Sequence, residues 1–187
     1  MTTSTSLDGT KQMYSKLSGL PQFPYQCIQY LMNENEMIWK LLKHNSPDAW
    51  NKSNLSKAEK AALIYSGEPD ATKFRVFQTT GIDDSWTIEA CQLRISVFEA
   101  TPNNYIWGSV LVGMEVYAHY KIQALSNYQS RVDVMIDELL KTFNGANIPS
   151  GLGRLFFDNS QSSRCRILPL GIPPMKGKVI IFGVHMV

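Results

Sequence analysis

Two long runs of alternating apolar and polar residues, joined by a turn signal, constrain the fold of this chain more than any other feature. They lie in Gln92–Tyr120, which reads QLRISVFEATPNNYIWGSVLVGMEVYAHY. Alternation with a period of two is typical of a strand that buries one face, and the residues TPNN are typical of a turn. The stretch therefore predicts a β-hairpin with two unlike faces.

One face of the predicted hairpin is apolar, and we expect it to point toward the core. Its members alternate along the two strands: Cys91, Leu93, Ile95, Val97, Val110, Val112, Met114, Val116 and Ala118. The opposite face is mostly polar and carries Gln92, Arg94, Ser96, Leu111, Glu115, Tyr117 and His119. Side chains alternate across a strand, so the two sets cannot share a side of the sheet.

The clearest helix is predicted in the stretch SNYQSRVDVMIDELLKTFNG, which follows the hairpin. Apolar residues recur there at spacings of three and four, which is typical of an amphipathic helix. They are Val132, Met135, Ile136, Leu139, Leu140 and Phe143. Asn144 and Gly145 are a typical end signal.

Helices are also predicted before the hairpin. Pro24 suits a first helical turn, and NENE (33–36) has a capping-box spacing with Asn33 as the cap. This apolar stripe continues to near His44, as one kinked helix or two short ones. SKAE (56–59) is a second capping box that opens a short helix.

Strands complete the predicted fold. KFRVFQ (73–78) alternates, and the final KVIIFGVHMV (178–187) is apolar on both faces, which is typical of a central strand. Between the long helix and that strand, residues 144–178 are rich in Pro and Gly and predict a long irregular loop. The fold class is therefore α+β: N-terminal helices and a mainly antiparallel β-sheet with one long amphipathic helix packed on it. We expect an extended arm at 1–22 and a single domain at 23–187.

Composition narrows the function classes. The chain has 187 residues and a net charge of +2, which is too small to indicate nucleic-acid or membrane binding by the whole protein. No apolar run approaches the roughly 20 residues that cross a bilayer, and the N-terminus does not resemble a signal peptide. Cys27, Cys91 and Cys165 are far apart, which argues against a disulfide framework or a cysteine zinc site and favours a reducing compartment.

No catalytic, cofactor-binding or metal-binding motif is recognisable. The three histidines lie outside HExxH and comparable motifs, and no GxSxG or Walker sequence occurs. Glu115 and His119 are four residues apart on one predicted strand, about 13 Å between Cα atoms, so they cannot form a direct acid–base pair. We therefore expect a protein that is not an enzyme. A small cytosolic enzyme with a site near these two residues remains an alternative.

The segment from Ala146 to Lys178 is basic. It carries Arg154, Arg164, Arg166, Lys176 and Lys178, against Asp158 alone. Such a cluster can contact phosphate groups, so a nucleic-acid-binding module is a further alternative. A solvated or subunit-facing loop is the simpler interpretation, and we favour a subunit interface over a DNA channel.

The order of these elements resembles the tail-terminator and neck (head-to-tail connector) proteins of tailed bacteriophages. The resemblance rests on NNYIWGSVLVGMEVYAHYKI, on SRVDVMIDELLKTFNG, and on the final GKVIIFGVHMV. The upstream WKLLKHNSPDAWNKSNLSKAEKAALI is similar to the helical lead-in of neck proteins in large phages. Together these stretches cover most of residues 39–187 at the level of pattern.

The resemblance implies a structural protein of the virion without catalytic residues or cofactors. Such proteins form homo-oligomeric rings, here with a hexamer favoured, between neighbouring head, neck or tail proteins. They assemble in the host cytoplasm, and DNA passes along the ring axis, where non-specific contacts are expected. It also implies that the polar hairpin face meets a neighbouring subunit or the channel, and that the arm Met1–Leu17 binds a neighbouring chain.

Overall fold

The structure is a computed structural model of the chain, and it describes residues 19–79, 88–102, 108–149, 152–158 and 164–185. The fold is α+β, as predicted. Its helices are α2 (Phe23–Glu34), α3 (Glu36–Lys43), α4 (Lys57–Ala62) and α5 (Arg131–Phe143). Short 3-10 turns lie at Leu20–Gln22, Ala49–Asn51, Ala71–Lys73 and Tyr120–Ile122.

The strands form one mixed sheet with the order β1-β2-β3-β7-β5-β4, and β6 pairs with β7 beside this path. They are β1 (Val76–Phe77), β2 (Cys91–Pro102), β3 (Gly108–His119), β4 (Asn147–Ile148), β5 (Gly153–Phe156), β6 (Arg166–Ile172) and β7 (Met175–His185). β1 runs parallel to β2, and the other pairs are antiparallel. The predicted hairpin is confirmed as β2 and β3, but Thr101 and Pro102 of the expected turn TPNN belong to β2 and pair with β3, and Asn103 and Asn104 lie outside the described residues.

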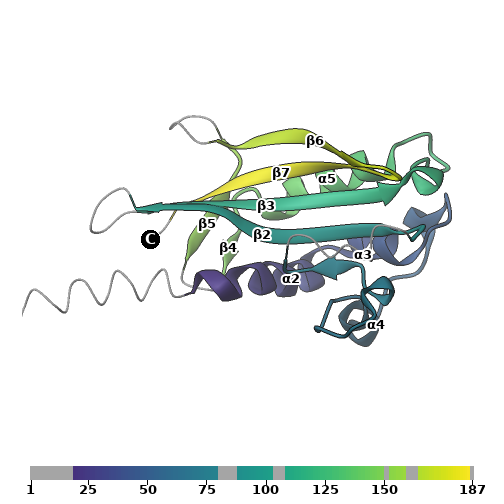
Figure 1. The fold of residues 1–187 in the computed structure, drawn as a ribbon, viewed down its shortest axis with the longest axis horizontal. Coiled ribbons are helices and arrows are strands. Elements are labelled where there is room, and N and C mark those ends of the chain that lie inside the picture. Colours follow the sequence, from purple (N-terminus) through teal and green to yellow (C-terminus); the bar gives the residue numbers. More distant parts are fainter. Residues whose placement is uncertain (1–18, 80–87, 103–107, 150–151, 159–163, 186–187) are drawn as a thin grey trace, which may run out of the picture.

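β7 lies at the centre of the sheet, as its two apolar faces predicted. It pairs along its whole length with β3 on one side, and on the other with β6 at one end and β5 at the other. Figure 1 shows β7 between β3 and β6. Ile180 and Phe182 are buried on one face, and Val179 and Ile181 on the other.

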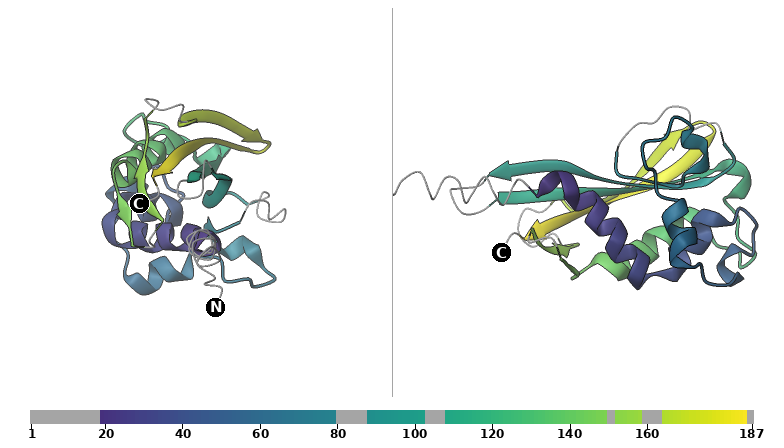
Figure 2. Two further views of the ribbon diagram at one scale, coloured as in Figure 1. Left: turned by 90° about the vertical axis from the view of Figure 1, so that its left-hand side faces the viewer. Right: turned by 90° about the horizontal axis from the view of Figure 1, so that it is seen from below.

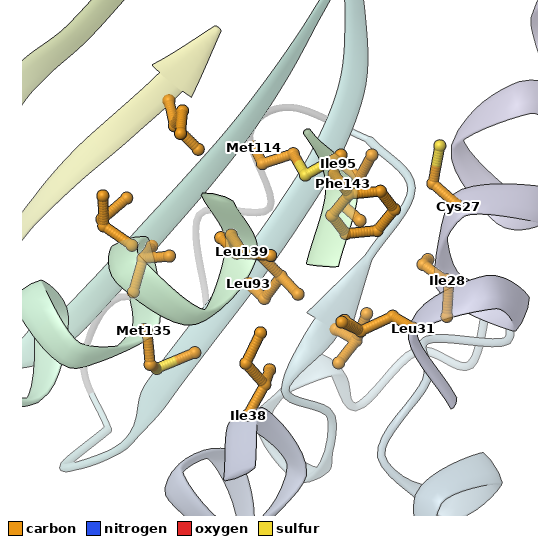
Figure 3. Packing of buried hydrophobic residues seen from close by; sticks show 14 of the residues in the cluster. Cys27, Ile28, Leu31, Ile38, Leu93, Ile95, Met114, Met135, Leu139 and Phe143 are labelled. Atoms are coloured by element: carbon orange, nitrogen blue, oxygen red, sulfur yellow. The ribbon is translucent and has the colours of Figure 1, made fainter. Parts of the chain in front are cut away.

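The core lies between one face of this sheet and helices α2, α3 and α5 (Figures 1 and 2). The alternating apolar set of β2 and β3 points into it, and all of its members are buried except Val97, which is partly buried. Figure 3 shows Leu139 and Met135 of α5 among Leu93 and Ile95 of β2 and Ile38 of α3. The apolar residues of the two alternating strands and those of the amphipathic helix thus pack against each other, as their spacing predicted. Leu140 is only partly buried at its edge.

The helix starts and ends follow local signals, with one correction. Ser56 and Glu59 form the predicted capping box, and Pro24 lies in the first turn of α2. The expected cap at Asn33 is wrong: α2 continues through Glu34, and Asn35 caps α3 instead. The backbone of Asn35 is extended and separates the two helices, and its side chain accepts a hydrogen bond from a backbone N–H in the first turn of α3.

Asn35 also ties this junction to α5. Its Oδ1 accepts a hydrogen bond from Ile38 N at 3.0 Å, and its Nδ2 donates to Glu138 Oε2 and Thr142 Oγ1, both at 2.9 Å. We expect Asn35→Ala to lower the free energy of unfolding by about 1–2 kcal/mol, since it removes a helix cap and two inter-helix bonds. Urea denaturation measures this, with the exposed Asn33→Ala as the control, and equal losses in the two variants would contradict the assignment.

A buried arginine fixes the loop after α3. The side chain of Arg131, the first residue of α5, is fully buried, and its five N–H groups all donate to backbone carbonyls at 2.7–3.1 Å. The acceptors are the carbonyl oxygens of Leu41, His44, Asn45, Ser46 and Ile122. One side chain therefore joins the end of α3, the following loop and the 3-10 turn after β3.

The expected long irregular loop at 144–178 is wrong. β4, β5, β6 and the start of β7 lie within it, and β6 pairs with β7 over seven residues. Pro169 makes this strand hard to predict from the sequence, because proline is rare in strands. An edge strand tolerates a proline at a position where the N–H would point away from the neighbouring strand. At the other end of the chain, the expected arm boundary at residue 22 is wrong, because Leu20–Gln22 form a 3-10 turn that leads into α2. Met1–Leu17 lie outside the described residues.

Candidate assembly surface

The polar face of the hairpin is not an open surface. Arg94, Tyr117 and His119 are 1%, 5% and 5% exposed in the isolated chain. The expectation that they meet a neighbouring subunit or a channel is therefore wrong, because each is already enclosed by its own chain. Glu115 is partly buried and accepts a hydrogen bond from the hydroxyl of Tyr117 at 3.2 Å.

Aromatic rings enclose Arg94. Its guanidinium lies 5.4 Å from the ring centroid of Phe77 in β1 and 5.7 Å from that of Tyr117 in β3. Phe77 in turn packs on Tyr65, which contacts Phe74. A cation between two rings is stabilised by their negative faces, so this end of the polar face is a second, small core.

Glycines make room for aromatic rings on the rest of this face. A Cβ on Gly113 would come within 2.2 Å of the Phe98 ring, and one on Gly183 within 2.2 Å of the Phe156 ring. At Gly177 the conflict would be with backbone, since the Cβ would lie 2.2 Å from the carbonyl oxygen of Val116. The glycines therefore provide the room that the rings occupy.

The close approach at Gly177 can be tested. Gly177→Ala should lower the free energy of unfolding by about 1–3 kcal/mol, because a strand backbone must move to admit the methyl group. Gly171→Ala, in the same hairpin, is the matched control, since a Cβ there meets nothing within 4 Å. Thermal unfolding followed by circular dichroism measures both, and an unchanged melting temperature for Gly177→Ala would contradict the geometry.

The residues considered for catalysis are not brought together. Nδ1 of His119 accepts the backbone N–H of Lys121 at 3.3 Å, and its ring lies against Tyr120. His44 lies at the C-terminal end of α3, where burial and nearby Lys43 lower its pKa. The side chain of His185 lies outside the described residues. Within the described residues no group of three or more His, Cys, Asp or Glu side chains could hold a metal ion.

The cysteines are buried thiols. Burial raises the pKa of Cys91 to about 12 and also raises the pKa of Cys27. A thiol with a raised pKa is a poor nucleophile, because the thiolate is the reactive form. These two cysteines therefore serve packing.

The five basic residues do not share a face. Lys178 lies on the helix side of β7 and forms an ion pair with Asp133 of α5 at 2.5 Å, whereas Arg166 in β6 lies on the opposite side, level with Ile181. Arg164 pairs with Glu99 of β2 at 2.6 Å. Nε of Arg154 donates to the carbonyl of Gly145 at 2.8 Å, and Lys176 is exposed. A single basic patch is therefore absent from the described residues.

β6 is the feature that the sequence analysis missed. It pairs only with β7 among the described strands. Three of its apolar side chains are exposed, Ile167 by 40%, Leu168 by 37% and Ile172 by 45%, and Leu170 is partly buried. Side chains alternate along a strand, so Arg166, Leu168 and Ile172 share one face, which we call the β6 surface. An exposed apolar edge strand is typical of an interaction site, since it otherwise favours aggregation.

Comparison with known proteins gives one match. The family model YomW matches residues 35–167, a range that includes all of the helices after α2 and the strands from β1 to β5, and that ends just after the start of β6. No curated protein and no solved structure matches the chain. Of the helices in the described residues, none combines the length and the apolar character that a bilayer crossing needs.

Proposed function

We propose that this chain, which belongs to the YomW family, is a structural protein of a phage particle. The family is named after a protein of the Bacillus phage SPbeta region. The phage association follows from the family. The finer proposal is a ring at the junction of head and tail, in the position of a neck or tail-terminator protein. In this role the protein acts by assembly and not by catalysis.

The β6 surface is the observation that carries the proposal. An edge strand whose apolar side chains are 37–45% exposed is unfavourable on a protein that stays monomeric, because these side chains remain in contact with water. A subunit that is covered by a neighbour does not carry this disadvantage. On the polar hairpin face, Arg94, Tyr117 and His119 are enclosed by their own chain, and Phe98 is 42% exposed. β6 therefore carries most of the exposed large apolar side chains among the described strands.

The ring is proposed as a homo-oligomer, with six copies favoured, that assembles in the host cytoplasm and contacts neighbouring head, neck or tail proteins. Head-to-tail contacts close such a ring when the rotation between copies fits. The basic residues lie on two sides of the sheet, and two of them are in ion pairs. Any contact with DNA in the channel is therefore a minor, sequence-independent part of the proposal.

Two measurements test the proposed function. Phage particles that carry the gene are purified through a density gradient, and the chain is quantified by mass spectrometry against the major capsid protein. We expect a few to about a dozen copies per particle, since a single ring contains few subunits. Absence from purified particles, with abundant chain in the lysate, would exclude a virion role. Electron microscopy with a tagged chain then tests the head–tail position.

A further inference from the structure

A tight hairpin before α5 places a tyrosine where glycine is usual. Ala124 pairs with Ser130, Leu125 N donates to the carbonyl of Gln129 at 3.0 Å, and Tyr128 N donates to the carbonyl of Leu125 at 3.1 Å. This is a three-residue loop whose last residue takes the left-handed conformation, and Tyr128 has a φ of 63°. Within the described residues it is the only non-glycine residue with a positive φ.

This conformation is unfavourable for tyrosine, because its Cβ approaches the following carbonyl oxygen. No burial offsets the strain, since the Tyr128 side chain is fully exposed, at 101%. Glycine or asparagine would fill the same turn with less strain. Strained residues that the local fold does not require often indicate a functional constraint. Here the constraint would act on the aromatic side chain of Tyr128.

The fold holds the turn in place. Ser126 N donates to the carbonyl of Pro47 at 2.9 Å, and the indole of Trp50 donates to Ser126 Oγ at 3.0 Å. Within the turn, Nδ2 of Asn127 donates to Oε1 of Gln129 at 2.8 Å. The tyrosine is therefore presented on a preorganised support, which reduces the entropy lost when a partner binds.

Two more exposed aromatic side chains belong to segments next to this hairpin. Trp50 is 36% exposed and contacts the turn, and Tyr120 is 56% exposed in the 3-10 turn Tyr120–Ile122 that leads into the hairpin. We call Trp50, Tyr120 and Tyr128 the aromatic end. Trp and Tyr are enriched among the residues that contribute most to protein–protein binding, so this group has the composition of a docking site for protein.

The β6 surface offers the complementary chemistry. Leu168 and Ile172 supply aliphatic contacts, and the exposed guanidinium of Arg166 can stack on an aromatic ring. Pro169 lacks an N–H and weakens the strand edge as a template for another strand. Side-chain docking is therefore favoured over strand addition on this surface.

We propose that Tyr128 of one copy docks on the β6 surface of a second copy. The cationic and aliphatic groups of β6 match the rings of the aromatic end, and the two surfaces are different parts of one chain. Contacts between unlike surfaces repeat from copy to copy and generate a ring or a chain. The contact deepens the proposed function by naming the subunit interface, and it can be tested without the virion.

The test uses the full chain in sedimentation velocity from about 1 μM to 1 mM, a range that detects the weak end of specific association. Wild type should self-associate, and Tyr128→Asn should weaken association at least tenfold. Because asparagine tolerates the left-handed conformation, Tyr128→Asn should also melt higher, by roughly 2–4 °C for a chain of this length. Tyr25→Asn, an exposed tyrosine on α2, is the control and should associate as wild type does.

A mixing experiment tests the pairing of the two surfaces. Leu168→Asp should weaken association as strongly as Tyr128→Asn does, while an equimolar mixture of the two variants should form a dimer and nothing larger. Each variant then retains one intact surface, so only one contact can form. Arg166→Glu replaces Leu168→Asp if the latter fails to fold.

The proposal is overturned if wild type stays monomeric at 1 mM, if Tyr128→Asn associates like wild type, or if the mixture contains only monomers. Measuring whether each chain is incorporated into phage particles distinguishes a failure of this contact from a failure of the proposed function. A Tyr128→Asn chain that still forms a ring in the virion would refute the contact alone. A wild-type chain that self-associates through Tyr128 but is absent from particles would refute the virion role alone.

Discussion

Replacing Arg131 with methionine is expected to lower the free energy of unfolding by about 3–5 kcal/mol, because a network of five hydrogen bonds to backbone carbonyls loses its donor. The carbonyl oxygens of Leu41 and Ile122 would stay buried and lose their donor, and the three partly buried carbonyl oxygens of the loop after α3 would lose theirs as well. Each buried acceptor without a donor costs about 1–3 kcal/mol, although local relaxation prevents a simple sum. The loop after α3 and the start of α5 should loosen together.

Urea denaturation at constant protein concentration measures this loss. Arg131→Lys should recover little of it, because an ammonium group cannot reach five acceptors that the planar guanidinium reaches from three nitrogens. Arg154→Met is the matched control, since that exposed arginine donates one bond to Gly145 and its loss should cost less than about 1 kcal/mol. Similar losses at both positions would contradict the role given to Arg131.

Leu139→Ala should lower the free energy of unfolding by about 2–5 kcal/mol. Leu139 is fully buried, and Figure 3 shows it beside Leu93 of β2, where helix and sheet meet. Truncation removes methyl groups from a region that rigid elements border on several sides, so a cavity should remain. The measurement is chemical denaturation together with the melting temperature.

The neighbouring Leu140→Ala is the control for this prediction. Leu140 is only partly buried at the edge of the core, so its truncation should cost less than that of Leu139. The helix pattern alone made the two leucines equivalent, because both fall in the apolar stripe. A larger loss for Leu140 than for Leu139 would indicate that α5 is rotated from the orientation in the structure.

The sequence predicted the elements whose apolar pattern is long. The hairpin, the amphipathic helix and the central position of β7 all follow from periodic burial, which repeats over many residues. Cap positions were less certain, because Asn33 and Asn35 offer the same side chain two residues apart. The choice between them depends on Glu138 and Thr142 of α5, which are distant in sequence.

The parts that the sequence did not predict depend on tertiary contacts. β6 looks like a loop because Pro169 and Gly171 interrupt it, and its strand exists only by pairing with β7. Arg94 looked like a surface residue because nothing near it in sequence indicates that Phe77 and Tyr117 enclose it. Tyr128 carries no signal either, since the left-handed turn is visible only in the backbone.

The central place of β7 has a consequence during synthesis. The inner edge of β3 remains without its partner until the ribosome has also made α5, β4, β5 and β6, which takes several seconds at about 5–20 residues per second. For that time the nascent chain exposes a long apolar strand edge to other nascent chains. Expression at a lower temperature or with co-expressed chaperones should therefore increase the yield of soluble protein more than substitutions on the surface of the folded chain.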